Sequence, residues 1–176
     1  QAVAEYSAAV RMPPALGIGT LEPAQKATGL AAGGALTGLP LVNMEGISHI
    51  IVEPDSGFFG IKDDSALAES LLREWCSAIR ADCLGIMFLG EGAVTATAAE
   101  RALTPLVYVP KADTMFWENS CASGSAAAGI YLASKAGQPV DVTLREPAGC
   151  LRVECDPAAG TTILYGSARL MAEYRK

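Results

Sequence analysis

The sequence contains a single histidine, and this scarcity limits the chemistry that the chain can support. His49 is the only one among 176 residues, which excludes a histidine-rich metal site. The five cysteines are an odd number without CxxC spacing, a pattern that disfavours both a disulfide framework and a zinc cluster. We therefore expect no bound metal, and reduced thiols in a cytoplasmic protein.

Charge and long apolar runs are also sparse. Only 18% of the residues are charged, and the formal net charge is −6. Nucleic acid is excluded as the main partner, because phosphate binding needs a cationic face. No uncharged apolar run reaches the length of a membrane-spanning helix, so we expect none. The apolar half of the chain is enough for the core of one ordinary domain.

Two helices stand out in a sequence that otherwise alternates like strands. Residues 65–79 carry apolar side chains about every four positions behind an acidic cap, which predicts an amphipathic surface helix. Residues 123–136 leave almost no polar face, so this second helix must be buried. Its first turns are small residues, which let neighbouring backbone approach closely. These patterns favour an α+β fold with strands wrapped around the second helix.

Cys121 stands where a strand ends and the buried helix begins. Helix starts expose unpaired N–H groups and the positive end of the macrodipole. We therefore expect a lowered pKa for the Cys121 thiol. We also expect the amides of Ala122, Ser123, Gly124 and Ser125 to form a cradle for a carboxylate. A thiolate beside such a cradle suits removal of the proton next to a substrate carboxylate.

Other interpretations of this thiol remain open at the level of the residues. A thiolate could also act as a nucleophile in acyl transfer, with His49 as the available base. A free cysteine is otherwise most often a small buried hydrophobe. We interpret the remaining four cysteines in that way: Cys76, Cys83, Cys150 and Cys155.

The segment Glu118–Ser125 (ENSCASGS), followed by three alanines, resembles the second catalytic-cysteine motif of the diaminopimelate epimerase family. Val42–His49 (VNMEGISH) is similar to the strand motif of that family, and Pro147–Glu154 (PAGCLRVE) to its later glycine-rich strand. Residues 11–13 (RMP) and Leu84–Phe88 (LGIMF) follow in the expected order. The resemblance therefore covers nearly the whole chain.

This resemblance implies a cofactor-independent racemase or epimerase built from two similar lobes. Each lobe is a mostly antiparallel β-barrel around one helix, and each supplies one cysteine to the substrate α-carbon. One cysteine removes a proton as thiolate, and the other delivers a proton from the opposite side. On this basis residues 1–176 form a single C-terminal lobe, which is inactive without the absent N-terminal lobe. The implied partners are that lobe, an amino-acid or carboxylic-acid substrate, and a second copy in a homodimer.

The resemblance also assigns the site. It implies that Cys121 is catalytic and that the substrate-binding residues are Glu118, Asn119, Ala122, Ser123, Gly124, Ser125 and His49. Three departures bear on the substrate: Ala122 replaces a glycine, Ile47-Ser48 replaces Asn-Pro, and Asn119 replaces an arginine. They favour the broader branch of amino-acid racemases, including the histidine racemases of metallophore pathways, over diaminopimelate itself. A PrpF-like isomerase of an unsaturated carboxylic acid, or a non-catalytic binding or assembly module of the same fold, is the alternative.

Overall fold

The protein is built on one long, open β-sheet with two helices. The computed structural model describes residues 4–22, 38–92 and 99–170. The strands are β1 (Ala4–Arg11), β2 (Gly17–Leu21), β3 (Leu39–Met44), β4 (Ile47–Val52), β5 (Leu84–Leu89), β6 (Ala99–Val109), β7 (Thr114–Trp117), β8 (Val140–Glu146), β9 (Gly149–Asp156) and β10 (Thr161–Leu170). The helices are α1 (Ser65–Ile79) and α2 (Ala122–Ala136), with three short 3₁₀ helices at Pro54–Ser56, Phe59–Asp63 and Pro110–Ala112.

The sheet runs in the order β1-β10-β9-β8-β6-β5-β4-β3-β2, and β7 pairs with β6. Its pairs are antiparallel except β4 with β5 and β6 with β8. Within the described residues β1 pairs only with β10 and β2 only with β3, so the two ends of the sheet do not meet. The mostly β architecture with two helices is confirmed. The expected closed barrel is wrong, because the sheet curls around a helix without joining its own edges.

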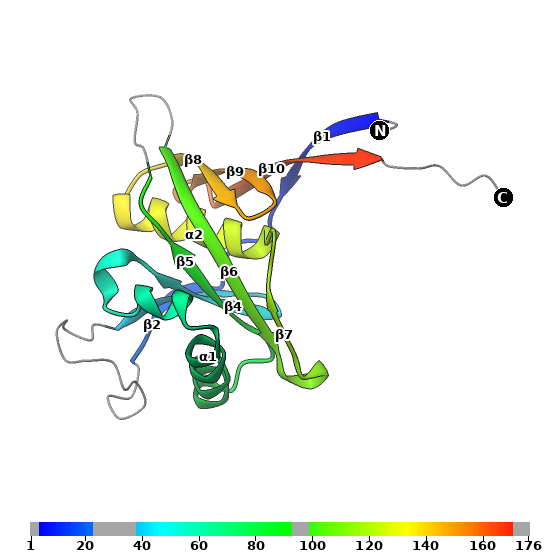
Figure 1. Ribbon diagram of the computed structural model, residues 1–176. Helices are drawn as coiled ribbons and strands as arrows, with labels where there is room; N and C mark the ends of the chain where they lie inside the picture. Colours follow the sequence, from blue (N-terminus) through cyan, green and yellow to red (C-terminus); the bar gives the residue numbers. More distant parts are fainter. Residues whose placement is uncertain (1–3, 23–37, 93–98, 171–176) are drawn as a thin grey trace.

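Helix α2 lies inside the curl of this sheet (Figure 1). It contacts β3, β4 and β5 on one side and β8, β9 and β10 on another. Cys121 precedes the helix as its N-cap, and Gly137 ends it in the left-handed conformation with a φ of 65°. The predicted central apolar helix at 123–136 is therefore confirmed to within a residue.

Helix α1 covers the opposite face of the central strands. The Asp64 side chain caps it by accepting a hydrogen bond from the Leu67 N–H at 3.1 Å. The side chains of Leu71, Leu72 and Trp75, on the helix itself, are fully buried. The expected amphipathic surface helix at 65–79 has the same bounds in the structure.

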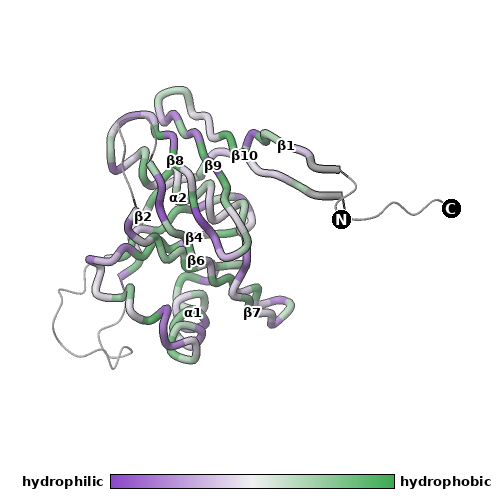
Figure 2. Tube along the Cα trace, turned by 45° about the horizontal axis from the view of Figure 1, so that its top comes forward, coloured by the Kyte–Doolittle hydropathy of each residue, from purple (hydrophilic) through white to green (hydrophobic). Residues whose placement is uncertain are grey.

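The central strands serve two cores because successive side chains of a strand point to opposite faces. Ile86 and Phe88 of β5 pack in the cluster beneath α1. Met87 and Leu89 of the same strand pack in the cluster around α2. Figure 2 shows hydrophobic residues running through the middle of the molecule along these strands. An unbroken apolar run such as Leu84–Leu89 is thus a strand buried on both faces.

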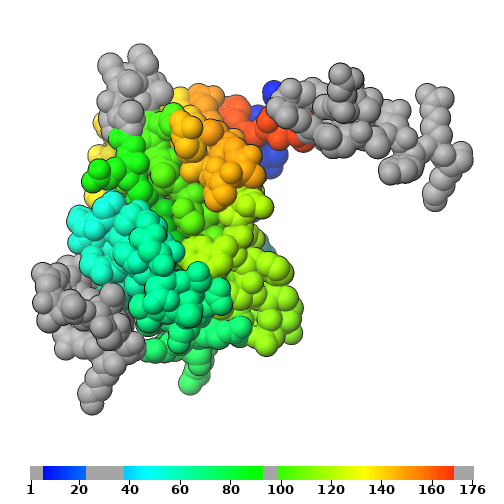
Figure 3. Space-filling model, viewed as in Figure 1, coloured from blue at the N-terminus to red at the C-terminus, as the bar shows by residue number. Residues whose placement is uncertain are grey.

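Strands β1 and β10 continue past the body of the molecule as a two-stranded arm (Figure 1), and their coloured atoms leave the body at the upper right of the space-filling view (Figure 3). They pair from Arg11 opposite Ile163 to Ala4 opposite Leu170. Tyr6 and Val10 on this arm keep 57% and 52% of their surface exposed. Neither helix in the described part of the chain is long and apolar enough to cross a membrane.

Candidate active site at the start of helix α2

The Cys121 thiol is folded back over the first turn of α2. The residue has an extended backbone, with φ −131° and ψ 101°, so its side chain can accept a hydrogen bond from the helix that follows. The Gly124 N–H donates to Sγ at 3.4 Å. Only 5% of the residue is exposed. Gly124 is required here, since a Cβ on it would lie 2.2 Å from Met87 Sδ and 3.0 Å from Cys121 Sγ.

His49 lies behind this turn and reaches it through a serine. Its Nε2 atom is 3.1 Å from Ser123 Oγ, and that hydroxyl is 3.8 Å from Cys121 Sγ. His49 is fully buried, which lowers the pKa of its imidazole to about 4. A Cβ on Gly85 would lie 2.6 Å from His49 Nδ1, so the glycine makes room for the ring. The imidazole is therefore neutral at pH 7 and contacts the site through Ser123.

The protonation of Cys121 differs from the sequence-based expectation. Burial, and after it the Glu118 carboxylate through hydrogen bonding and charge, together raise the pKa of its thiol to about 12. The Gly124 N–H and the Ser123 hydroxyl act in the opposite direction. The expected lowering of the pKa is wrong, because loss of solvation around a buried thiolate outweighs the donors of the helix start. Cys121 is a protonated thiol at neutral pH.

The expected amide cradle is only partly available. The Ser125 N–H already donates to the Cys121 carbonyl at 2.9 Å, and the Gly124 N–H is directed at the thiol. For the N–H groups of Ala122 and Ser123 we find no acceptor in the part of the chain that the structure describes. These two amides are the backbone donors that remain for a small anion.

Glu118 and Asn119 lie in the segment that leads from β7 into the helix. The Glu118 N–H donates to the Pro105 carbonyl at 3.0 Å, and its half-buried carboxylate is close enough to raise the pKa of Cys121. Asn119 is exposed, and its carbonyl accepts a hydrogen bond from the Ala148 N–H at 3.0 Å. The structure thus gathers Glu118, Asn119, residues 122–125 and His49 around the Cys121 thiol, while their role in binding a substrate stays a prediction.

Sequence reasoning missed Glu146, which contacts this site from another strand. Its carboxylate accepts hydrogen bonds from the Cys121 N–H at 2.9 Å and from Ser125 Oγ at 2.5 Å. A signal was present in the strand pattern: Val142, Leu144 and Glu146 alternate on the buried face of β8. A glutamate at an inward position needs a partner, and here that partner is the start of α2.

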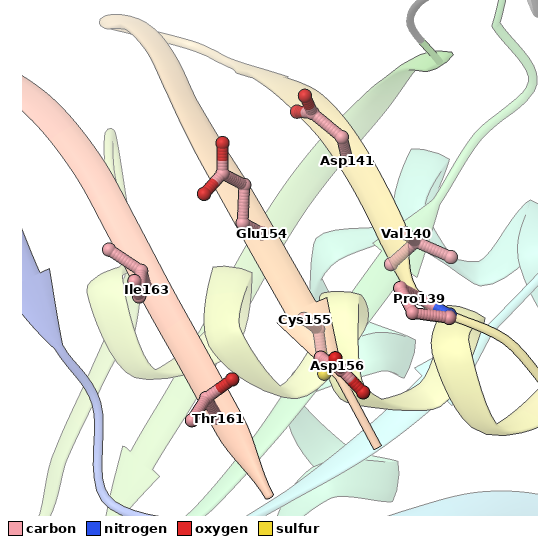
Figure 4. A pocket seen from close by; sticks show the side chains of 8 residues that line it. All are labelled: Pro139, Val140, Asp141, Glu154, Cys155, Asp156, Thr161 and Ile163. Atoms are coloured by element: carbon pink, nitrogen blue, oxygen red, sulfur yellow. The ribbon is translucent and has the colours of Figure 1, made fainter. Parts of the chain in front are cut away.

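An open surface pocket of about 360 Å³ lies elsewhere, on β8, β9 and β10 (Figure 4). Glu154 sits there between Asp141 and Ile163, which are its partners on the neighbouring strands. None of the predicted site residues lines this pocket. This pocket is therefore not part of the candidate site at Cys121.

Comparisons with known proteins point to one class. The family model described as histidine racemase CntK N-terminal domain matches residues 1–165. A histidine racemase of Staphylococcus aureus (strain Mu50 / ATCC 700699) is 30% identical over 110 residues, which are 60% of this chain and 38% of that protein. A histidine racemase of Fusobacterium nucleatum subsp. nucleatum (strain ATCC 23726 / VPI 4351) is 33% identical over 98 residues, which are 53% of this chain and 32% of that protein. The chain spans about a third of the length of these curated relatives.

A solved structure extends the comparison to the fold. A Clostridium difficile (strain 630) protein assigned to phenazine biosynthesis (PhzC/PhzF) matches 98% of this chain and 58% of its own, with a TM-score of 0.51 and 13% identity. At that identity the likeness concerns the fold alone. The matching family model describes an N-terminal domain, so the comparisons support the racemase family but not the expected C-terminal position of this lobe.

Proposed function

This chain belongs to the histidine racemase CntK N-terminal domain family, and on that premise we propose that it is one lobe of an amino-acid racemase. The reaction is proton transfer at the substrate α-carbon without a cofactor. The observation that carries the proposal is the Cys121 thiol at the start of α2, held between the Gly124 N–H, the Ser123 hydroxyl and Glu118. A second lobe supplies the opposing group, so the present chain is inactive alone.

Cys121 acts first as an acid in this proposal. Its thiol is protonated at neutral pH, so it delivers a proton to one face of the substrate carbanion. The opposing cysteine of the other lobe has by then taken the α-proton from the opposite face. Cys121 is left as a thiolate, which the Gly124 N–H and the Ser123 hydroxyl stabilise by donating hydrogen bonds. In the reverse direction this thiolate is the base, and the proton count balances in both directions.

His49 supports the thiolate form through Ser123. A neutral imidazole with its proton on Nε2 donates to Ser123 Oγ, which leaves the hydroxyl hydrogen free for Cys121 Sγ. The opposite tautomer would place a buried N–H on Nδ1, and Nδ1 has no partner among the described residues. Burying an unpaired donor is costly, which favours the Nε2 proton.

The substrate is an α-amino acid, and its two charged groups have complementary partners at this site. The carboxylate binds the free N–H groups of Ala122 and Ser123 at the positive end of the helix. The ammonium group lies near Glu118. Because that carboxylate raises the pKa of the thiol, a bound cation beside it lowers the cost of forming the thiolate. The histidine racemases among the relatives make histidine the first substrate to test.

The test is solvent exchange of the α-proton in the complete protein that carries this chain. Histidine and a panel of other L-amino acids are incubated in deuterium oxide and followed by NMR and chiral chromatography. We expect deuterium at the α-carbon together with formation of the D-enantiomer for at least one of them. Absence of exchange with every amino acid would contradict the proposal, and turnover of an unsaturated carboxylic acid instead would assign the PrpF-like alternative.

A further inference from the structure

A carboxylate is buried directly behind the candidate thiol. Glu146, the last residue of β8, is only 5% exposed. In the part of the chain that the structure describes, no lysine, arginine or histidine forms an ion pair with it. A buried charge is costly unless hydrogen bonds compensate it. The position of Glu146 therefore has to be explained by what it binds.

Both carboxylate oxygens of Glu146 bind the first turn of α2. Oε2 accepts the Cys121 N–H at 2.9 Å, and Oε1 accepts the Ser125 hydroxyl at 2.5 Å. The second distance lies in the short range of hydrogen bonds between a hydroxyl and a carboxylate. These two contacts lie on either side of Gly124, whose N–H binds the thiol.

The hairpin of β8 and β9 also binds the chain just before Cys121, at Asn119. Glu146 pairs with Gly149 at the tip of the β8–β9 hairpin, and Ala148 in the turn donates its N–H to the Asn119 carbonyl at 3.0 Å. Three hydrogen bonds from one hairpin thus hold the segment from residue 119 to residue 125, two of them at its backbone and one at the Ser125 side chain. The thiol lies within that span.

We propose that Glu146 is a positioning residue that holds the Cys121 thiol in place by binding the Cys121 N–H and the Ser125 side chain in the first turn of α2. This inference rests on the proposed function, in which Cys121 is the reacting thiol. Without Glu146 the N-cap N–H loses its acceptor, the first turn loosens, and Sγ no longer stays against the Gly124 N–H. The other ionisable groups that bear on Cys121 are the Glu118 carboxylate and, through Ser123, the neutral His49.

Two substitutions separate positioning from ordinary stabilisation. Glu146→Ala removes both acceptors, whereas Glu146→Gln keeps a carbonyl oxygen that can still accept the Cys121 N–H. Glu53→Ala is the matched control, because Glu53 anchors the far part of the same helix through Tyr131 and Lys135. Losing Glu53 should destabilise α2 without touching its first turn.

The readout is the rate of Cys121 alkylation by iodoacetamide between pH 7 and 11, measured by peptide mass spectrometry on the complete protein. We expect Glu146→Ala to raise the rate about tenfold and to move its rise to lower pH, since burial of the thiol is relieved. Glu146→Gln should stay within about threefold of the wild type, and Glu53→Ala within about twofold despite a lower melting temperature.

An unchanged rate in Glu146→Ala, or equal changes in Glu146→Ala and Glu53→Ala, would overturn the inference. If Glu146→Ala does not fold, Glu146→Asp is measured in its place, with a smaller rate increase expected and an unchanged rate again contradicting the role. Alkylation requires no substrate. A protein that shows the expected alkylation pattern but exchanges no α-proton would therefore refute the proposed function and leave the positioning role standing.

Discussion

At the level of single residues, burial keeps both Cys121 and His49 uncharged at neutral pH. Burial lowers the pKa of His49 to about 4, and burial together with the Glu118 carboxylate raises the pKa of Cys121 to about 12. The sequence placed both residues near one site, because each falls in a recognisable motif. It could not give their protonation, since the loss of solvent around a side chain depends on every element packed against it.

His49 makes a direct prediction about stability. The unfolded chain binds a proton on His49 below about pH 6.5, whereas the folded protein binds it only near pH 4. The stability that the neutral imidazole contributes is thus present above pH 6.5 and is lost as the pH falls towards 4. Its size is roughly 3 kcal/mol.

Urea unfolding at pH 7 and pH 4 measures this contribution. In His49→Gln, which has nothing to titrate at this position, the difference between the two pH values should be smaller than in the wild type by about that amount. The carboxylates contribute equally to both proteins. The same pH dependence in both proteins would show that His49 is not the group responsible.

At the level of the elements, α2 fits inside the sheet because its packing face is made of small residues. Gly129 lies against Val153 of β9, and a Cβ on it would be 2.5 Å from Val153 Cγ1. Val153 is fully buried and branched at its Cβ, so it cannot turn aside cheaply.

Gly129→Ala should therefore destabilise the protein by about 1–3 kcal/mol, less the gain in helix propensity. Adding Val153→Ala should recover part of that loss, because the new methyl group fills the space that the valine leaves. Ser134→Ala on the exposed side of α2 serves as the control, with an expected change within about 0.5 kcal/mol. Chemical denaturation of the wild type, Gly129→Ala, Val153→Ala and the double variant gives the coupling energy, and strictly additive effects would contradict the packing account.

The two helices could be predicted from the sequence almost to the residue, because their signals are local. Asp64 caps α1, Gly137 ends α2, and the run of alanines after Ser125 leaves no polar face. Two features could not be predicted: that the sheet stays open, and that Glu146 contacts Cys121. Both depend on how strands distant in the sequence are arranged, and no periodicity encodes that arrangement.

At the scale of the whole molecule, the open sheet leaves the outer edges of β1 and β2 without a partner strand within the described residues. The arm of β1 and β10 exposes Tyr6 and Val10, and two-stranded ribbons are marginally stable in water without further packing. The chain also spans only about a third of its curated relatives. The proposal that this chain is one lobe of a larger racemase predicts that the other lobe covers the Cys121 side.

The most direct test of the central claim is α-proton exchange by a variant of the complete protein in which only Cys121 is replaced. We predict that Cys121→Ser lowers the rate of deuterium incorporation into the substrate at least about a thousandfold, because a serine hydroxyl is a far poorer acid and base at this position. Cys155→Ser, at a buried thiol on β9 away from the site, should retain the wild-type rate within about threefold. Exchange by Cys121→Ser at the wild-type rate would contradict the account.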